Sequence, residues 1–325
     1  MTVPAPVLRV EELVVAFPGP SGPVRAVDGA SFDLVPGRVL GMVGESGSGK
    51  SMAAYAILGL VPRPGRIVAG RILFEGRDLR TVSAREMRAV RGAGIAMIFQ
   101  NPMTALNPVL RIDTQVVEAL RAHRRMDART AWREAVRALA GVGISDPERR
   151  LRSYPHELSG GMRQRVAIAI ALLHRPRAIL ADEPTTALDV TVQAQILHRM
   201  RRRTRDAGAA LLWITHDLAV VAGLAHEIAV MYAGWIVEHG SADDVLDRPL
   251  HPYTVGLIGA IPRRGKPLYR IPGAPPSRLD LPSGCPFRNR CPRADEACRV
   301  PPPTTAPFPG RRVRCFHPHM AKGNP

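Results

Sequence analysis

Residues 44–51, near the N-terminus, have the residue types and spacing of a phosphate-binding loop. They read Gly-Glu-Ser-Gly-Ser-Gly-Lys-Ser, between an apolar segment at 39–43 and a helix-competent segment at 52–58. The glycines let backbone N–H groups face phosphate oxygens, and the helix N-terminus adds partial positive charge. The alternative is a glycine-rich turn that matches by chance. The motif predicts a nucleoside triphosphate site at Gly44, Ser46, Gly47, Gly49, Lys50 and Ser51.

A second glycine-containing motif, residues 158–165, precedes an apolar helix at 166–173. Ser159 is a natural N-cap, and Gly160 and Gly161 leave backbone donors open at the helix start. The segment predicts a second anion site. Capping chemistry alone is the simpler alternative for a Ser-Gly-Gly sequence.

Two adjacent acids follow a continuous apolar run at 178–181, which is typical of a strand buried on both faces. Asp182 and Glu183 therefore fall at a strand's carboxyl end, where open α/β sheets place their ligand chemistry. We expect Asp182 to hold Mg²⁺, together with the Ser51 hydroxyl, and Glu183 to act as general base on the attacking water. A solvated turn is the alternative for the two acids taken by themselves.

In combination these motifs resemble the ATP-binding-cassette (ABC) family, whose signature is LSGGQ followed by a basic stretch. Met162 stands where glutamine is commonest, but the serine and both glycines are kept, so we expect no loss of function. The resemblance covers about residues 7–260. It implies an α/β fold. The P-loop ABC nucleotide-binding domain would span residues 1–245 and include a helical subdomain at about 101–157. In that subdomain apolar residues recur at helical spacing over 114–122 and 131–140.

The resemblance assigns further residues to the ATP site. Gln100, after an expected strand at 95–99, resembles the Q-loop glutamine that senses Mg²⁺ and the attacking water. His216, after an expected strand at 211–215, resembles the switch histidine at the γ-phosphate, and Asp189 lies in a segment similar to the D-loop. Phe17 occupies the place of the aromatic residue that stacks on adenine, with a role in the core as the alternative.

One phosphate loop and one signature occur in this sequence. In ABC proteins the γ-phosphate lies between the phosphate loop of one cassette and the signature of another. The resemblance therefore implies that one chain cannot close a catalytic site alone. We expect ATP to join two cassettes, either two copies or this chain and a related one, and hydrolysis to separate them.

The composition changes past about residue 245, where proline becomes dense and little regular structure is expected. His251-Pro252-Tyr253-Thr254 and the segment 101–108 resemble oligopeptide and dipeptide importer ATPases. This implies ATP-driven import of peptides, or of nickel or another small solute, at the cytoplasmic face of the inner membrane. The implied partners are two integral membrane permease subunits, a second ABC ATPase chain and an extracytoplasmic solute-binding protein. A disordered terminus is the alternative for this tail.

All four cysteines lie in this C-terminal extension, residues 246–325, at Cys285, Cys291, Cys298 and Cys315. Because the cytosol keeps thiols reduced, a metal site is favoured over disulfides. The gaps exceed those of tight C-x₂-C zinc pairs, and four cysteinates are the usual ligands of a [4Fe–4S] cluster. Similar importer ATPases carry such a cluster in this tail. Zinc remains an alternative, since His317 and His319 lie beside Cys315, and so do unliganded thiols.

Charge and hydropathy argue against two other kinds of protein, a nucleic-acid-binding protein and an integral membrane protein. The 325 residues carry a formal net charge of +17, mostly from dispersed arginines without an aromatic-interleaved platform, so we expect no nucleic-acid partner. The competing class is a soluble ABC ATPase acting on nucleic acid, which generally has coiled-coil insertions or two cassettes. The longest apolar run, 166–173, is shorter than the roughly 20 residues that span a bilayer, so we expect a peripheral subunit.

Overall fold

The computed structural model describes residues 4–20, 22–101, 105–185, 190–261 and 270–319. The chain forms two compact units, and each is assembled from segments that are far apart in the sequence. The helical unit comprises Met1–Val7, Val35–Arg38 and Thr81–Leu212, and the phosphate-loop unit comprises Leu8–Leu34, Val39–Arg80 and Trp213–Pro325. The C-terminal extension is therefore grouped with the phosphate loop.

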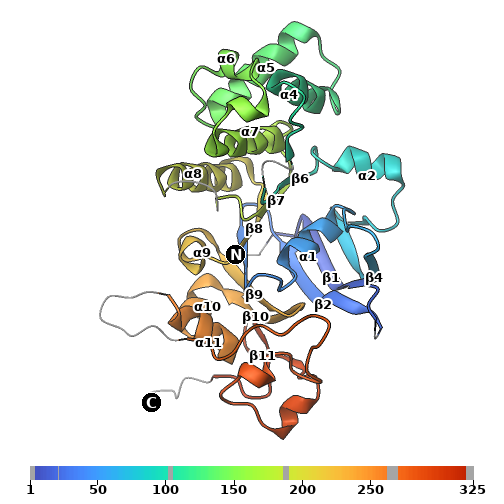
Figure 1. The fold of residues 1–325 in the computed structure, drawn as a ribbon, viewed down its shortest axis with the longest axis vertical. Helices are drawn as coiled ribbons and strands as arrows, with labels where there is room; N and C mark the ends of the chain where they lie inside the picture. The colour runs from blue at the N-terminus through green and yellow to red at the C-terminus, as the bar shows by residue number, and fades with distance from the viewer. Residues whose placement is uncertain (1–3, 21, 102–104, 186–189, 262–269, 320–325) are drawn as a thin grey trace. The chain divides into compact units, whose positions relative to one another are not determined.

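Four helices give the helical unit its name and are drawn in green in Figure 1: α4 (Ile112–Arg121), α5 (Ala128–Gly141), α6 (Pro147–Leu151) and α7 (Gly160–Leu172). Apolar residues at helical spacing are buried on α4 and α5, which confirms the helices predicted from periodicity. Asp127 begins α5 by accepting a hydrogen bond from the Thr130 N–H at 2.8 Å.

The strands of the helical unit carry the predicted acidic residues. β6 (Ile95–Ile98) and β7 (Ala178–Asp182) run parallel and are buried throughout, as their continuous apolar sequences predict. β8 (Ala210–Thr215) is also fully buried, and its first three residues belong to this unit. Two more helices, α2 (Ala84–Val90) and α8 (Val190–Ala207), and the short 3-10 helix η1 (Pro155–Glu157) also belong to this unit.

The phosphate-loop unit contains an antiparallel sheet in the order β2-β1-β4-β5. Its strands are β1 (Leu8–Phe17), β2 (Val24–Leu34), β4 (Arg66–Phe74) and β5 (Arg77–Asp78). The first two pair along their full length, and inward residues such as Leu8, Leu13 and Phe32 are buried.

A second set of strands in this unit has the order β11-β12-β10-β9-β3. β3 (Val39–Val43) is parallel to β9 (Glu227–Tyr232), which is antiparallel to β10 (Trp235–Ser241). Helices α1 (Lys50–Ile57), α9 (Leu218–Leu224), α10 (Ala242–Asp247) and α11 (Pro252–Gly259) belong to the same unit. The apolar segment at 39–43 that precedes the phosphate loop is thus strand β3.

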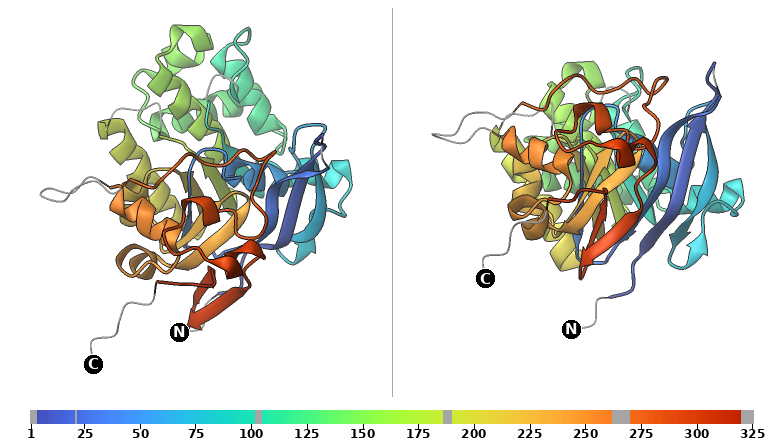
Figure 2. Two further views of the ribbon diagram at one scale, coloured as in Figure 1. Left: turned by 60° about the horizontal axis from the view of Figure 1, so that its bottom comes forward. Right: turned by 90° about the horizontal axis from the view of Figure 1, so that it is seen from below.

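The C-terminal extension has short regular elements, as its proline content predicts. They include the 3-10 helices η2 (Arg288–Arg290) and η3 (Glu296–Arg299) and the strands β11 (Thr304–Phe308) and β12 (Arg311–Arg314). β12 pairs with β10, and Figure 2 shows this red hairpin beside the orange strands. Within the described ranges, no helix is long and apolar enough to cross a bilayer.

Candidate nucleotide and cysteine sites

The predicted phosphate loop connects β3 to α1 and folds around the ammonium group of Lys50. The Nζ atom donates hydrogen bonds to the carbonyl oxygens of Gly44 (2.7 Å) and Glu45 (2.9 Å) and to the Ser48 hydroxyl (3.2 Å). The lysine is 5% exposed. The loop is thus a closed turn with a cation at its centre, an arrangement suited to phosphate oxygens.

Two glycines of the loop are required by close approach of other backbone segments. A Cβ atom on Gly44 would lie 2.1 Å from the carbonyl oxygen of Met231, and one on Gly49 would lie 2.3 Å from that of Ala26. Gly49 also has a φ of 106°, which L side chains rarely adopt. Residues other than glycine would therefore distort the loop at both positions.

Three further residues predicted for the ATP site also belong to the phosphate-loop unit. Ser51 lies in the first turn of α1, and Phe17 ends β1 with its ring over Gly65, where a Cβ would come within 2.4 Å. His216 follows β8 and is exposed. Asp217, which the sequence did not single out, begins α9 by accepting from the Ala219 N–H at 2.8 Å.

In the helical unit, two predicted catalytic residues and a predicted Mg²⁺ ligand lie at the ends of β6 and β7. The side-chain amide of Gln100 donates to Glu183 Oε2 at 3.3 Å, and Asp182 is buried at the end of β7. Glu183 has a φ of 44°, an uncommon left-handed conformation for a residue with a side chain. Such conformations concentrate at functional sites, where the surrounding structure enforces them.

The predicted second anion site is the exposed N-terminus of α7. Ser159 caps the helix by accepting from the Met162 N–H at 3.3 Å, as predicted, and both Ser159 and Gly160 are exposed. Gln164, which sequence reasoning missed, is buried and donates to the Pro184 carbonyl at 2.9 Å. The signature helix is therefore bonded to the segment that directly follows Glu183. Asp189 lies outside the described residues.

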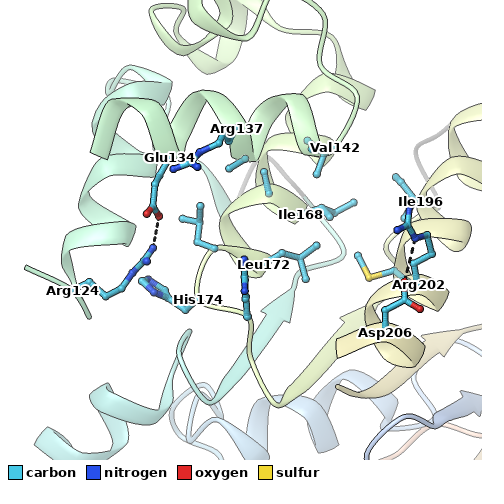
Figure 3. A pocket seen from close by; sticks show the side chains of 16 residues that line it. Arg124, Glu134, Arg137, Val142, Ile168, Leu172, His174, Ile196, Arg202 and Asp206 are labelled. Atoms are coloured by element: carbon cyan, nitrogen blue, oxygen red, sulfur yellow. Dashed lines mark hydrogen bonds and ion pairs between the residues drawn. The ribbon is translucent and has the colours of Figure 1, made fainter. Parts of the chain in front are cut away.

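A separate cavity of about 870 Å³ lies among α5, α7 and α8 of the helical unit (Figure 3). Its floor is apolar, with Val142, Ile168 and Leu172 among the lining residues, and its rim carries the pairs Arg124–Glu134 (2.5 Å) and Arg202–Asp206 (3.3 Å). Its lining contains none of the predicted nucleotide residues, so this cavity is distinct from the predicted ATP site.

The four cysteines line one small cavity in the phosphate-loop unit, together with His251, Phe287 and His317. All four are described, and all are free thiols rather than disulfides. The cavity holds about 10 Å³, on the order of one water molecule. The predicted convergence of these residues, which span Cys285 to Cys315 in the sequence, is thus present in the fold.

The surroundings of the thiols disfavour free thiolates. Burial raises the pKa of Cys285 to about 11 and that of Cys315 to about 12. Backbone N–H groups nevertheless point at the sulfurs: those of Arg293 and His317 donate to Cys291 Sγ (3.4 Å) and Cys315 Sγ (3.3 Å). A positive metal centre would supply the charge that converts these thiols to thiolates.

His251 contributes a buried polar atom to the same cavity. Its Nδ1 accepts a hydrogen bond from the Tyr253 N–H at 3.0 Å, so the ring proton resides on Nε2. Nε2 has no hydrogen-bond partner among the described residues, although the side chain is 1% exposed. Burial lowers the pKa of His251 to about 3, which keeps the ring neutral. An N–H donor in this position suits a sulfur-rich group in the cavity.

The spacing of the ligand atoms separates two kinds of metal site. Asp295, Cys298 and His317 have ligand atoms within 4.8 Å of one another, as a single ion requires. The four cysteines do not form such a group among the described residues. Four thiolates on one tetrahedral zinc ion lie about 3.8 Å apart, from Zn–S bonds of about 2.3 Å. In a cluster each thiolate binds a different iron, so wider spacing is required.

Family models match two parts of the chain. The model described as "ABC transporter" matches residues 27–186, and the model described as "Oligopeptide/dipeptide transporter, C-terminal region" matches residues 237–298. Among solved structures, the dimeric structure of MJ0796, a bacterial ABC transporter cassette, aligns with a TM-score of 0.66 at 24% identity over 72% of this chain and 98% of that one. CbiO1 of Clostridium perfringens gives 0.62 at 26% identity, over 75% and 91%. Fold and motifs thus define an ABC transporter ATPase.

Curated relatives narrow this class. The oligopeptide transport ATP-binding protein OppD of Salmonella typhimurium is 50% identical over 96% of this chain and 93% of its own length. The dipeptide transport ATP-binding protein DppD of Bacillus subtilis is 48% identical over 95% and 94%. The chain therefore belongs to the oligopeptide/dipeptide group of ABC transporter ATP-binding subunits.

Proposed function

We propose that this chain hydrolyses ATP to power the import of peptides across the cytoplasmic membrane. The observation that carries the proposal is near full-length similarity, at 46–50% identity, to relatives named for oligopeptide and dipeptide transport. The match of residues 237–298 to the C-terminal region of such transporters supports the same solute class. Nickel or another small solute is the competing cargo.

Each part of the proposed ATP site has its own task. Lys50 and the loop amides bind the β- and γ-phosphates, and Phe17 stacks on adenine. Ser51, Gln100 and Asp182 offer the oxygen ligands that suit Mg²⁺, which when bound neutralises charge on the phosphates. Glu183, held by Gln100, orients the attacking water and accepts its proton, and His216 contacts the γ-phosphate.

A closed site requires a second cassette in this proposal. The start of α7, where Ser159 and Gly160 are exposed and Gly161 is partly buried, presents backbone N–H groups and the positive end of the helix. These groups complete the charge cradle around the γ-phosphate bound by the partner, and Asp189 communicates across the interface. ATP binding then closes the pair, and hydrolysis opens it.

The assembly follows from that cycle. Two integral membrane permease subunits receive the motion at the cytoplasmic face of the membrane, and an extracytoplasmic solute-binding protein delivers the peptide. The predicted division into an ATPase domain at 1–245 and an extension at 246–325 is kept as part of the proposal, with the extension packed in the phosphate-loop unit.

We further propose that the four cysteines hold a [4Fe–4S] cluster, because the donor set, the N–H···S hydrogen bonds and the orphaned His251 Nε2 suit one. The cavity of about 10 Å³ requires the thiols to move outward to admit it. Its task is structural: it cross-links a proline-rich segment that has only short regular elements. Zinc at Cys298, His317 and Asp295 is the competing assignment.

Growth on peptides tests the transport function. An amino-acid auxotroph of the source organism that lacks this chain should fail to grow on di- or tripeptides that contain the required amino acid, and should grow on the free amino acid. Reintroducing the chain should restore growth on peptides. If the strain without the chain grows normally on peptides but shows a defect in nickel-dependent growth, the imported solute would be nickel rather than peptides.

A further inference from the structure

Arg290, from the cysteine-bearing segment, contacts the phosphate loop directly. Its guanidinium forms two hydrogen bonds to the Glu45 carboxylate, Nη1 to Oε2 at 2.7 Å and Nη2 to Oε1 at 2.9 Å. The arginine side chain is 6% exposed and that of Glu45 is 25% exposed. Bidentate charge-assisted pairs of this kind fix geometry as well as adding energy. The neighbouring residue, Cys291, is one of the four thiols.

Residues of the extension and of β9 surround the Arg290 guanidinium. The guanidinium also donates to the Pro272 carbonyl (2.9 Å) and to the Tyr232 hydroxyl (3.3 Å), and it lies 5.8 Å from the centre of the Phe287 ring. These contacts restrict the side chain to one orientation. The position of the Glu45 carboxylate is therefore determined by the extension.

Tyr253 makes a second contact between the extension and the same loop residue. Its hydroxyl accepts a hydrogen bond from the Glu45 N–H at 2.8 Å, and the side chain is fully buried. The ring packs against those of Tyr232 and Phe287, with centroids 4.6 and 5.4 Å away. Both the backbone and the side chain of Glu45 are thus held by residues that follow β9.

Arg278 makes the third contact, at Gly47. Its guanidinium donates to the Gly47 carbonyl through Nη2 (2.7 Å) and Nε (3.1 Å), and to the Arg25 carbonyl through Nη1 (2.9 Å). Because a trans peptide places its N–H opposite its C=O, fixing this carbonyl also fixes the Ser48 N–H. That N–H points to the other side, where it donates to the Glu45 carbonyl at 3.2 Å.

These contacts matter because the loop binds phosphate through its own backbone. Gly44, Gly47 and Gly49 have φ values of 156°, 74° and 106°, so the loop itself has wide conformational freedom. External contacts that select one conformation reduce the entropy that ATP binding must remove. A carboxylate at position 45 would also repel a triphosphate unless a cation neutralises it.

We infer that Arg290 is a positioning residue for ATP: by pairing with Glu45 it orders and neutralises the phosphate loop, and the cysteine-bearing extension thereby sets nucleotide affinity. The inference rests on the proposed ATP site. The simpler reading is that the ion pair only attaches the extension to the unit. That reading predicts lower thermal stability but unchanged nucleotide binding when the pair is removed.

Calorimetric titration of the full chain with ATPγS and Mg²⁺ distinguishes a positioning role of Arg290 from simple attachment of the extension. Arg290→Met should weaken binding at least about fivefold, the lower end of coupling between linked sites. Its matched control is Arg299→Met, which removes an exposed arginine of the same extension that pairs with Glu296 at 2.8 Å. The control should bind within about twofold of the wild type, as surface substitutions do. Equal affinities for both variants would overturn the inference.

A second substitution tests the electrostatic part. In Arg290→Met the Glu45 carboxylate is left without its guanidinium, so adding Glu45→Gln should restore part of the lost affinity. In steady-state assays Arg290→Met should raise the KM for ATP more than it lowers kcat. A double variant that binds no more tightly than Arg290→Met would contradict the neutralising role.

Tyr253→Phe keeps the test available if Arg290→Met does not fold, because it removes one hydroxyl and retains the ring. It should accelerate hydrogen exchange of the Glu45 amide and weaken ATPγS binding in the same direction. Unchanged affinity in Tyr253→Phe and in Arg278→Met would overturn the inference. A failure of the proposed ATP site would look different, because Lys50→Ala would then bind ATPγS as well as the wild type.

Discussion

The side-chain amide of Gln100 lies 3.3 Å from a carboxylate oxygen of Glu183, although the two residues are 83 positions apart in the sequence. The parallel pairing of β6 and β7 brings them together, because it aligns the carboxyl ends of the two strands. Both side chains are polar and hydrogen-bonded to each other, and Glu183 has a left-handed backbone conformation. Both members of this pair belong to the helical unit.

Glu183→Gln should retain ATP binding and lose most turnover. The amide keeps the shape and the contact with Gln100 but cannot accept a proton, and general-base contributions are about 10²–10⁴-fold. Steady-state phosphate release measures the effect, with Glu148→Gln, an exposed residue of α6, as the control. Turnover above about a tenth of the wild-type rate would remove Glu183 from the role of base.

Ser159→Arg should block ATP-driven pairing of cassettes while ATP binding to the phosphate loop persists. The large cationic side chain would occupy the exposed start of α7, where the partner's γ-phosphate is proposed to bind. Light scattering in a Glu183→Gln background reports pairing. Ser83→Arg, at the N-cap of α2, controls for the lost cap, since Ser83 also accepts a hydrogen bond within its helix. Unchanged pairing of Ser159→Arg would place the signature away from the interface.

His239 should make the fold sensitive to acid. Burial, followed by the charge of Arg312, lowers its pKa from 6.5 to about 4. The Glu227 carboxylate at 3.4 Å is 30% exposed and does not reverse this direction. The unfolded chain therefore binds the proton first as pH falls below 6.5. Stability should fall by up to about 1.4 kcal/mol per pH unit between 6.5 and 4 from this group.

Urea unfolding at a series of pH values measures that slope. His239→Leu should reduce it, because the variant has no proton to bind, whereas the exposed His198→Leu should not. Equal slopes in all three proteins would show that His239 is not held neutral in the fold.

Protein purified without oxygen should be brown and contain about four irons per chain. Cys285→Ser should bleach the colour and make the extension more susceptible to proteolysis, because metal binding energy contributes to its folding. His319→Gln is the control. Stoichiometric zinc without iron would reject the cluster and retain a metal site. Protein that contains neither metal and has its cysteines paired as disulfides would reject both the cluster and the metal site.

Most residues of the proposed ATP site could be named from sequence because each part of the site is a local pattern. The phosphate loop is eight consecutive residues, and the strand before Asp182 is one apolar run. The pairing of Arg290 with Glu45 could not be predicted in this way. The partners are 245 residues apart, and Arg290 is one of 45 basic residues without a distinguishing periodicity.

The cysteine site is an intermediate case. Confinement of all four thiols to one segment predicted their convergence, and the shared cavity agrees with it. The buried His251 ring was missed, because sequence shows neither that its Nδ1 caps α11 nor that its Nε2 lacks a partner among the described residues. Such a signal depends on burial and on the hydrogen bond of the other ring nitrogen, which only the fold supplies.

Peptide uptake by the reconstituted transporter tests the central claim most directly. The complex that co-purifies with this chain would be placed in proteoliposomes with ATP on the side of the ATPase subunits, and accumulation of a labelled tripeptide would be measured. The account predicts ATP-dependent accumulation that is lost with Glu183→Gln in this chain, while the Glu148→Gln complex transports normally. Accumulation without ATP, or undiminished transport by the Glu183→Gln complex, would contradict it.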